Sequence, residues 1–154
     1  MFQISALPPP QFSHLLGKTD QELAAPGAVV MTADAKPGFP CRVSLRDAEP
    51  GERVLLFNHE HQAADTPYRS AHAIFVIEGA EAAAIPVGEV PDVMKGRTLS
   101  VRAFSADDMM TDADLVDGKI AAALFEKLLG DPKVAYLHAH YAKRGCYAAR
   151  IDRA

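Results

Sequence analysis

Residues 117–151, DGKIAAALFEKLLGDPKVAYLHAHYAKRGCYAARI, contain the signals that decide the fold class. The first half predicts an amphipathic helix, because apolar residues recur at helical spacing between the capping side chain of Asp117 and the stop signal at Gly130. The second half predicts two strands, at residues 134–141 and 146–151, that flank a polar turn. A helix followed by a strand hairpin is typical of an antiparallel sheet that a helix covers.

The rest of the chain predicts more strands and few helices. A short helix is expected after Pro10, where apolar residues follow the proline at helical spacing. The turn signal at Pro50-Gly51 predicts a hairpin between two of the strands, 41–45 and 53–57. Further strands are expected at residues 28–33, 72–77 and 98–104. We therefore predict the α+β class, a largely antiparallel sheet packed by one or two helices, as a single domain spanning residues 1–154.

Composition bounds the environment and the partners. The chain has 154 residues, a formal net charge of −4 and a pI near 5.8. This charge does not provide the basic surface that contacts to phosphates require, so we expect no nucleic acid partner. No apolar run reaches the roughly 20 residues of a membrane span, and the first residues lack the basic region of a signal peptide. We expect no membrane partner and a cytoplasmic location, where Cys41 and Cys146 stay reduced.

The most informative local motif is His138-x-His140 in a predicted strand. Residues two apart in a strand point to the same face, so both imidazoles can approach one metal ion. If Gly145 is the left-handed residue of a three-residue loop, Ala142 pairs with Cys146 and the thiol joins the histidine face. With two or four loop residues, the Cys146 side chain points to the other face. The position of the glycine favours the three-residue loop.

Three of the four histidines earlier in the chain lie in segments that can converge on this strand. His59 and His61 fall within residues 58–70, which we predict to be a polar surface loop, and His72 begins the next strand. Folding can bring these segments to the His138-x-His140 strand. We therefore consider a divalent transition metal ion as a cofactor, without assigning a metal ligand. The alternative is that the histidines are hydrogen-bonded or solvated side chains that titrate near neutral pH.

Other motifs exclude several common sites. The chain has no glycine-rich dinucleotide or phosphate loop and no G-x-S-x-G elbow of a hydrolase. The acidic run at residues 107–117 lacks the oxygen ligands of a calcium loop, so we interpret it as a solvated segment that leads into the helix. Arg42, Arg102 and Arg150 lie in predicted strands, where a guanidinium needs an anionic partner or a full set of acceptors. An ion pair within the chain is favoured over an anionic ligand.

Several stretches carry a resemblance to a known family. They are PCRVSLRD at 40–47, PGE at 50–52, PYRSAHAIFV at 67–76, and the segments 99–104, 116–118 and 135–147. Over residues 1–153 the chain resembles the bacterial domain-of-unknown-function family 1203. The resemblance implies a compact single domain without a known cofactor, substrate or catalytic residue.

The resemblance also bears on individual positions. The residues that it implies to be part of the family pattern are Cys41, Arg42, Tyr68, His138 and Cys146. It further implies that His72 and His140 are replaced in some branches. Tyr141 and Arg144 depart from the Asn and Pro expected in close relatives, and the loss of the proline loosens the final turn.

These observations lead to two hypotheses for function. The first is a small-molecule pocket, either for binding alone or metal-assisted, lined by Cys41, Arg42, Tyr68, His72, His138, His140 and Cys146. In this pocket His138 is a ligand or general base, either cysteine is a thiolate or second ligand, and Arg42 anchors an anionic group, with Tyr68 as a hydrogen-bonding wall. The second is a non-catalytic interaction or structural module. An exposed edge strand in a small open sheet is compatible with a homodimer.

Overall fold

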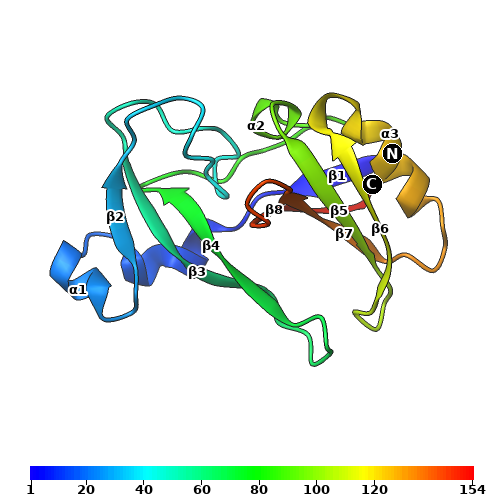
Figure 1. Ribbon diagram of the computed structural model, residues 1–154, viewed down its shortest axis with the longest axis horizontal. Helices are drawn as coiled ribbons and strands as arrows, with labels where there is room; N and C mark the ends of the chain where they lie inside the picture. The colour runs from blue at the N-terminus through cyan, green and yellow to red at the C-terminus, as the bar shows by residue number, and fades with distance from the viewer.

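Two antiparallel sheets lie side by side in the computed structural model, which describes residues 1–154 (Figure 1). The five-stranded sheet has the order β1-β8-β7-β5-β6, with β1 at Phe2–Ser5, β8 at Tyr147–Arg153, β7 at Tyr136–Tyr141, β5 at Thr98–Phe104 and β6 at Met110–Asp117. The three-stranded sheet has the order β2-β3-β4, with β2 at Val29–Thr32, β3 at Arg53–Gln62 and β4 at Ser70–Ile77. Every pair of neighbouring strands is antiparallel, which confirms the predicted α+β class.

The helices are short and lie around the two sheets. They are η1 at Pro9–Leu15, α1 at Asp20–Ala24, α2 at Asp92–Lys95, η2 at Gly118–Ile120 and α3 at Ala121–Leu129. Figure 1 shows α1 beside β2 and α3 beside the five-stranded sheet. None of these helices has the length and apolar character that crossing a lipid bilayer requires.

The predicted helix after Asp117 is present and begins with the 3-10 turn η2. The Asp117 carboxylate accepts a hydrogen bond from the backbone N–H of Lys119 at 2.9 Å, and α3 ends before Gly130 as expected. Gly118 is required here, because a Cβ at this position would lie 1.9 Å from the carbonyl oxygen of Met94 at the end of α2. The glycine therefore allows α2 and the α3 segment to pack in direct contact.

Strand β7 is buried on both faces, and this position determines where its histidines lie. Leu137, Ala139 and Tyr141 belong to the core that α3 covers, a cluster of 21 buried residues. Alternation along the strand sends His138 and His140 to the opposite face, where they contact side chains of the three-stranded sheet. A second cluster of 15 buried residues forms the core of that sheet.

The predicted hairpin between residues 41–45 and 53–57 is wrong. Residues 41–45 form a tight loop, in which Leu45 has a positive φ of 45°, and only isolated bridges connect Pro40 to Asp47 and Cys41 to Phe75. Strand β3 pairs instead with β2 and β4. Cys41 and Val43 are buried in the core of the three-stranded sheet, and Leu45 is buried in the core of the five-stranded sheet. The apolar pattern of this loop therefore indicates burial and not a strand.

Two further segments predicted to be irregular are strands. Strand β3 continues through Gln62 and β4 begins at Ser70, so the predicted loop at 58–70 shrinks to the connection between them. In this hairpin His61 and Gln62 contact residues of β7 in the second sheet, so polar side chains stand where the buried face of a strand usually has apolar ones. The acidic segment at 107–117 contains the edge strand β6, whose side chains are mostly solvent-exposed.

The final hairpin differs from the favoured register. Gly145 has the predicted left-handed φ, at 78°, but it closes a four-residue loop. The N–H of Gly145 donates to the carbonyl of Tyr141, and the N–H of Tyr141 donates to the carbonyl of Cys146. Cys146 therefore packs on the Tyr141 side of the sheet, and the prediction that its thiol shares the histidine face is wrong.

Candidate functional site

A cavity of about 670 Å³ lies between the two sheets, within the range of roughly 300–1,000 Å³ that is typical of small-molecule sites. Its walls come from β3, β4, the ends of β5 and β7, the turn before β8, and the loop between β2 and β3. The lining residues are Gly38, Pro40, Arg42, Leu56, His72, Ala73, Phe75, Gly96, Arg97, Thr98, Tyr141, Lys143, Arg144 and Cys146.

The cavity wall is cationic. Four lining residues carry a positive charge, namely Arg42, Arg97, Lys143 and Arg144, and none is acidic. Arg97 is neutralised by an ion pair with Asp47, but the other three have no carboxylate within ion-pair distance. A cavity with this wall attracts anionic molecules.

Arg42 is the most buried of these cations, with only 1% of its surface exposed. Its Nε donates to the carbonyl of Tyr147 at 2.7 Å, one Nη donates to the carbonyl of Pro40, and the other lies 3.1 Å from the Sγ of Cys146. A guanidinium has five N–H donors, so two remain for another acceptor. The predicted ion pair of Arg42 with a carboxylate is absent, whereas Arg150 pairs with Asp152 at 2.8 Å.

Tyr141 places an unused donor at the same wall. Its ring lies between two guanidinium groups, with the Cζ atoms of Arg42 and Arg97 at 4.9 and 5.1 Å from the ring centroid. The hydroxyl is buried and has no hydrogen-bond partner in the protein. Burial raises the pKa of Tyr141 to about 12, so the hydroxyl keeps its proton at neutral pH. This group can donate a hydrogen bond to a bound anion.

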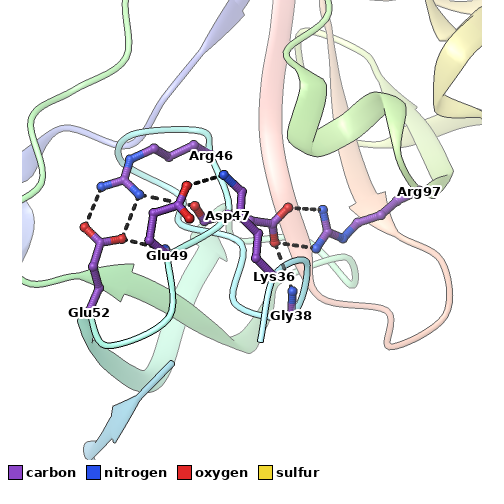
Figure 2. Close-up of polar contacts among 7 residues, drawn as sticks. All are labelled: Lys36, Gly38, Arg46, Asp47, Glu49, Glu52 and Arg97. Carbon is purple, nitrogen blue, oxygen red and sulfur yellow. Dashed lines mark hydrogen bonds and ion pairs between the residues drawn. The ribbon is translucent and has the colours of Figure 1, made fainter. Parts of the chain in front are cut away.

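An ion pair connects the cavity loop to the five-stranded sheet. Figure 2 shows Asp47 between the Arg97 guanidinium, with contacts of 2.6 and 3.0 Å, and the backbone N–H of Gly38 at 3.3 Å. The same loop is held from outside by the pair of Arg46 with Glu52 at 2.8 Å. These contacts fix the loop that carries Arg42 into the cavity.

A cluster of histidines lies next to the cavity, between β3, β4 and β7. His72 belongs to both, because it lines the cavity and its Nδ1 lies 2.9 Å from the Nε2 of His61. The His61 ring is 5.9 Å from the His138 ring and 4.9 Å from the His140 ring, measured between centroids. One ring nitrogen each of His61, His138 and His140 lies within 4.8 Å of the others.

Burial keeps this cluster neutral. His138 and His140 are 3% and 0% exposed, and desolvation lowers the pKa of each to about 3. Desolvation also lowers the pKa of the half-buried His61 to about 4, with a smaller contribution from His72. The cationic Arg102, which has no hydrogen bond or ion pair in the protein, lowers the pKa of all three further. At neutral pH each ring therefore has one nitrogen with a free lone pair.

Two β-bulges bring these histidines together. His61 is the extra residue of a bulge in β3, between the pairs Glu60–Ala71 and Gln62–Ser70. A bulge turns neighbouring side chains toward one face, and both His61 and Gln62 contact residues of β7. The second bulge lies between β7 and β8, where Ala139 pairs with Ala149 and His140 with Tyr147.

The seven residues predicted for the site divide into three groups. Arg42, His72 and Cys146 line the cavity, and His138 and His140 lie in the adjacent histidine cluster. Cys41 is fully buried in the core of the three-stranded sheet, where its sulfur accepts the N–H of Ile77 at 3.3 Å. Tyr68 packs near Phe104, at 6.3 Å between ring centroids, and does not line the cavity.

Sequence reasoning missed the cationic wall and the role of His61. Arg97, Lys143 and Arg144 follow no motif, since their convergence depends on how the two sheets pack. His61 has a usable signal, because its spacing of two from His59 continues the strand that begins at Arg53. The unpaired hydroxyl of Tyr141 also has no sequence signal, because it depends on what packs against the end of β7.

Comparison with known proteins identifies a family and no characterised relative. No curated protein matches the chain, and no solved structure does. The chain does match the family described as "Protein of unknown function (DUF1203)" over residues 38–153, a segment that contains every residue of the cavity wall and of the histidine cluster. The chain belongs to this family.

Proposed function

We propose that the protein binds a small anionic molecule, a carboxylate or a phosphate ester, in the cavity between its sheets. The observation that carries this proposal is the unpaired hydroxyl of Tyr141, on a ring that the Arg42 guanidinium contacts, in a cavity lined by no acidic side chain. An anionic oxygen at this position would accept hydrogen bonds from both groups, and charge-assisted bonds of this kind are the stronger ones. The exposed Lys143 and Arg144 would attract the anion to the opening and screen its charge.

The cavity volume supports a ligand larger than a free inorganic ion. About 670 Å³ accommodates a metabolite with an apolar portion, and Leu56, Ala73 and Phe75 provide an apolar part of the lining. We therefore expect phosphate esters and aliphatic or aromatic carboxylates to bind more tightly than inorganic phosphate. Cys146 lies at the same wall, with its sulfur on the Arg42 guanidinium, and would contact the anionic end of the ligand.

The test is a titration calorimetry panel of sugar phosphates, dicarboxylates, aromatic carboxylates and inorganic phosphate, in the presence of a chelator. The variant K143A/R144A should lower the affinity for the best ligand at least about tenfold, the effect of roughly 1.4 kcal/mol of lost electrostatic attraction. Its matched control is K127A/K133A, which removes two exposed lysines outside the cavity and changes the net charge equally.

The result also separates this proposal from an interaction or structural module. A module of that kind would bind none of the panel, and its thermal stability would not respond to added anions. Equal losses in K143A/R144A and K127A/K133A would show that only the overall charge matters, and would contradict a site in the cavity.

A further inference from the structure

We propose that His61, His138 and His140 form a binding site for a divalent transition metal ion, with Zn²⁺ as the preferred ion. This inference goes beyond anion binding and does not depend on it. The three side chains come from two strands of different sheets, β3 and β7, so a bound ion would connect the sheets at the inner side of the cavity.

The spacing of the nitrogens suits a tetrahedral ion. One nitrogen of each ring lies within 4.8 Å of the others. Zinc–nitrogen bonds of about 2.0–2.1 Å with tetrahedral angles place ligand nitrogens about 3.4 Å apart. The rings must therefore approach one another by at most about 1.4 Å, which small side-chain rotations provide, above all at the half-buried His61.

Hydrogen bonds present two of the three histidines, His61 and His140, in a form that can bind a metal. The Nδ1 of His140 lies 2.9 Å from the carbonyl oxygen of Gly145, and because a carbonyl only accepts, the lone pair of this ring is on Nε2. The Nε2 of His61 lies 2.9 Å from the Nδ1 of His72, which leaves the His61 Nδ1 as the second nitrogen available to a metal. Metal-bound histidines almost always use their other nitrogen in this way.

Three ring nitrogens of the cluster have no partner in the protein. They are the Nδ1 of His61, the Nδ1 of His138 and the Nε2 of His140, and all three atoms are buried. An unsatisfied buried polar atom costs about 1–3 kcal/mol, so three in one place need a physical explanation. A metal ion supplies it, because each lone pair would then be coordinated.

The ligand set selects the ion. Three imidazoles without a carboxylate favour zinc, copper, nickel or cobalt over the oxygen-preferring magnesium and calcium. Neither cysteine takes part, since the Cys41 sulfur accepts backbone N–H groups and the Cys146 sulfur contacts Arg42. Three protein ligands leave a fourth position open, the arrangement of catalytic rather than structural zinc sites.

Arg102 indicates what would occupy the fourth position. Its side chain has no hydrogen bond or ion pair in the protein, and its charge lowers the pKa of the three histidines. The cross-strand register places it directly opposite His138. A guanidinium beside a dication is unfavourable unless an anionic ligand lies between them, so we infer that the open position binds hydroxide or an anionic group.

The experiment uses untagged protein that has been stripped with a chelator and is then titrated with Co²⁺ and with Zn²⁺. We expect one ion per chain and, for cobalt, the intense visible bands of four-coordinate geometry. H61Q should weaken Zn²⁺ binding more than about 100-fold, because it removes a ligand. H72Q should weaken it by about 10–100-fold, the range for residues that hydrogen-bond a metal ligand. H59Q is the matched control, since His59 is a half-buried histidine of the same strand that is not one of the three ligands.

Each outcome decides the proposal. Binding of less than one ion per chain would overturn it, and so would an affinity that H61Q leaves unchanged or that H59Q lowers as much as H61Q. If the fully buried H138Q and H140Q variants do not fold, H61Q and the cobalt spectrum still give the answer, because His61 is only half-buried. Loss of Zn²⁺ binding in H61Q with anion binding retained would leave the proposed function intact.

Discussion

The substitution Tyr141→Phe should make the protein more stable and its anion binding weaker. The Tyr141 hydroxyl is buried without a partner, whereas its ring keeps Arg42 and Arg97 at 4.9 and 5.1 Å from the centroid. Phenylalanine preserves the ring and removes only the unsatisfied group. Because such a group costs about 1–3 kcal/mol, we expect the free energy of unfolding to rise by about 1–2 kcal/mol.

Tyr136→Phe is the matched control and should change stability in the opposite direction. The Tyr136 hydroxyl donates to the carboxylate of Asp108 at 2.6 Å and accepts from the amide of Gln62 at 2.7 Å. Removing it leaves the buried Gln62 amide unsatisfied, so we expect a loss of about 1–3 kcal/mol. The two variants delete the same hydroxyl from the first and the last residue of β7, once where it has two hydrogen-bond partners and once where it has none.

Urea denaturation followed by circular dichroism measures both effects. A change in the midpoint at constant slope reports a change in stability without a change in the exposed surface. Calorimetry on Tyr141→Phe should show anion affinity lowered roughly 10–100-fold, the equivalent of a lost hydrogen bond of about 1.5–3 kcal/mol to a charged group. A loss of more than about 1 kcal/mol of stability in Tyr141→Phe would show that the hydroxyl has a structural partner, and would refute the reasoning.

Three further predictions concern the histidine cluster and the helix junction. Burial lowers the pKa of His138 and His140 to about 3, whereas histidines of the unfolded chain titrate near 6.5, so below pH 6.5 the unfolded chain binds more protons than the folded protein. The free energy of unfolding of the metal-free protein should therefore fall by about 4 kcal/mol between pH 7 and 5. A decrease below about 1 kcal/mol, measured by urea denaturation at the two pH values, contradicts this. Zinc at 100 times its dissociation constant should stabilise the wild type by about 2.7 kcal/mol in thermal unfolding and leave H61Q unchanged. Gly118→Ala should cost more than about 2 kcal/mol, since the new Cβ would meet the Met94 carbonyl at 1.9 Å, whereas the exposed Lys119→Ala should be neutral in the same assay.

Local signals were sufficient for elements whose burial follows a simple period. The helix after Asp117 combines a cap, an apolar stripe and a glycine stop, and the strand at Thr98–Phe104 alternates because α3 covers one of its faces. The same reasoning failed for β3 and β4 beyond Phe57, because this hairpin packs polar side chains against a second sheet. Polar residues that are buried at a site have the same sequence pattern as polar residues in solvent.

The candidate site was predictable in its residue types and not in its assembly. His138-x-His140 indicated a shared face, and that face does contain the histidine cluster. The third member, His61, depends on a bulge whose position follows from the pairing of β3 with β4, and Cys146 depends on the length of one loop. A shift of one residue moves a side chain to the other face of a sheet, so both depend on register, which short-range patterns leave undetermined.

The distribution of unsatisfied groups favours a ligand site over a structural core. Five buried side-chain atoms lack a hydrogen-bond partner in the protein, and four of them belong to the histidine cluster or to Tyr141; the fifth is the Ser44 hydroxyl. At about 1–3 kcal/mol each, these four would cost roughly 4–12 kcal/mol, comparable to the entire stability of a typical domain at about 5–15 kcal/mol. Apolar side chains of similar volume would pack the same space without this cost. A fold that served only as a scaffold would gain stability from such replacements, whereas a fold that binds a metal ion and an anion recovers the cost when they bind. The stability of the ligand-free protein should therefore increase when these groups are replaced by apolar side chains of matching shape, and the same variants should bind neither ligand.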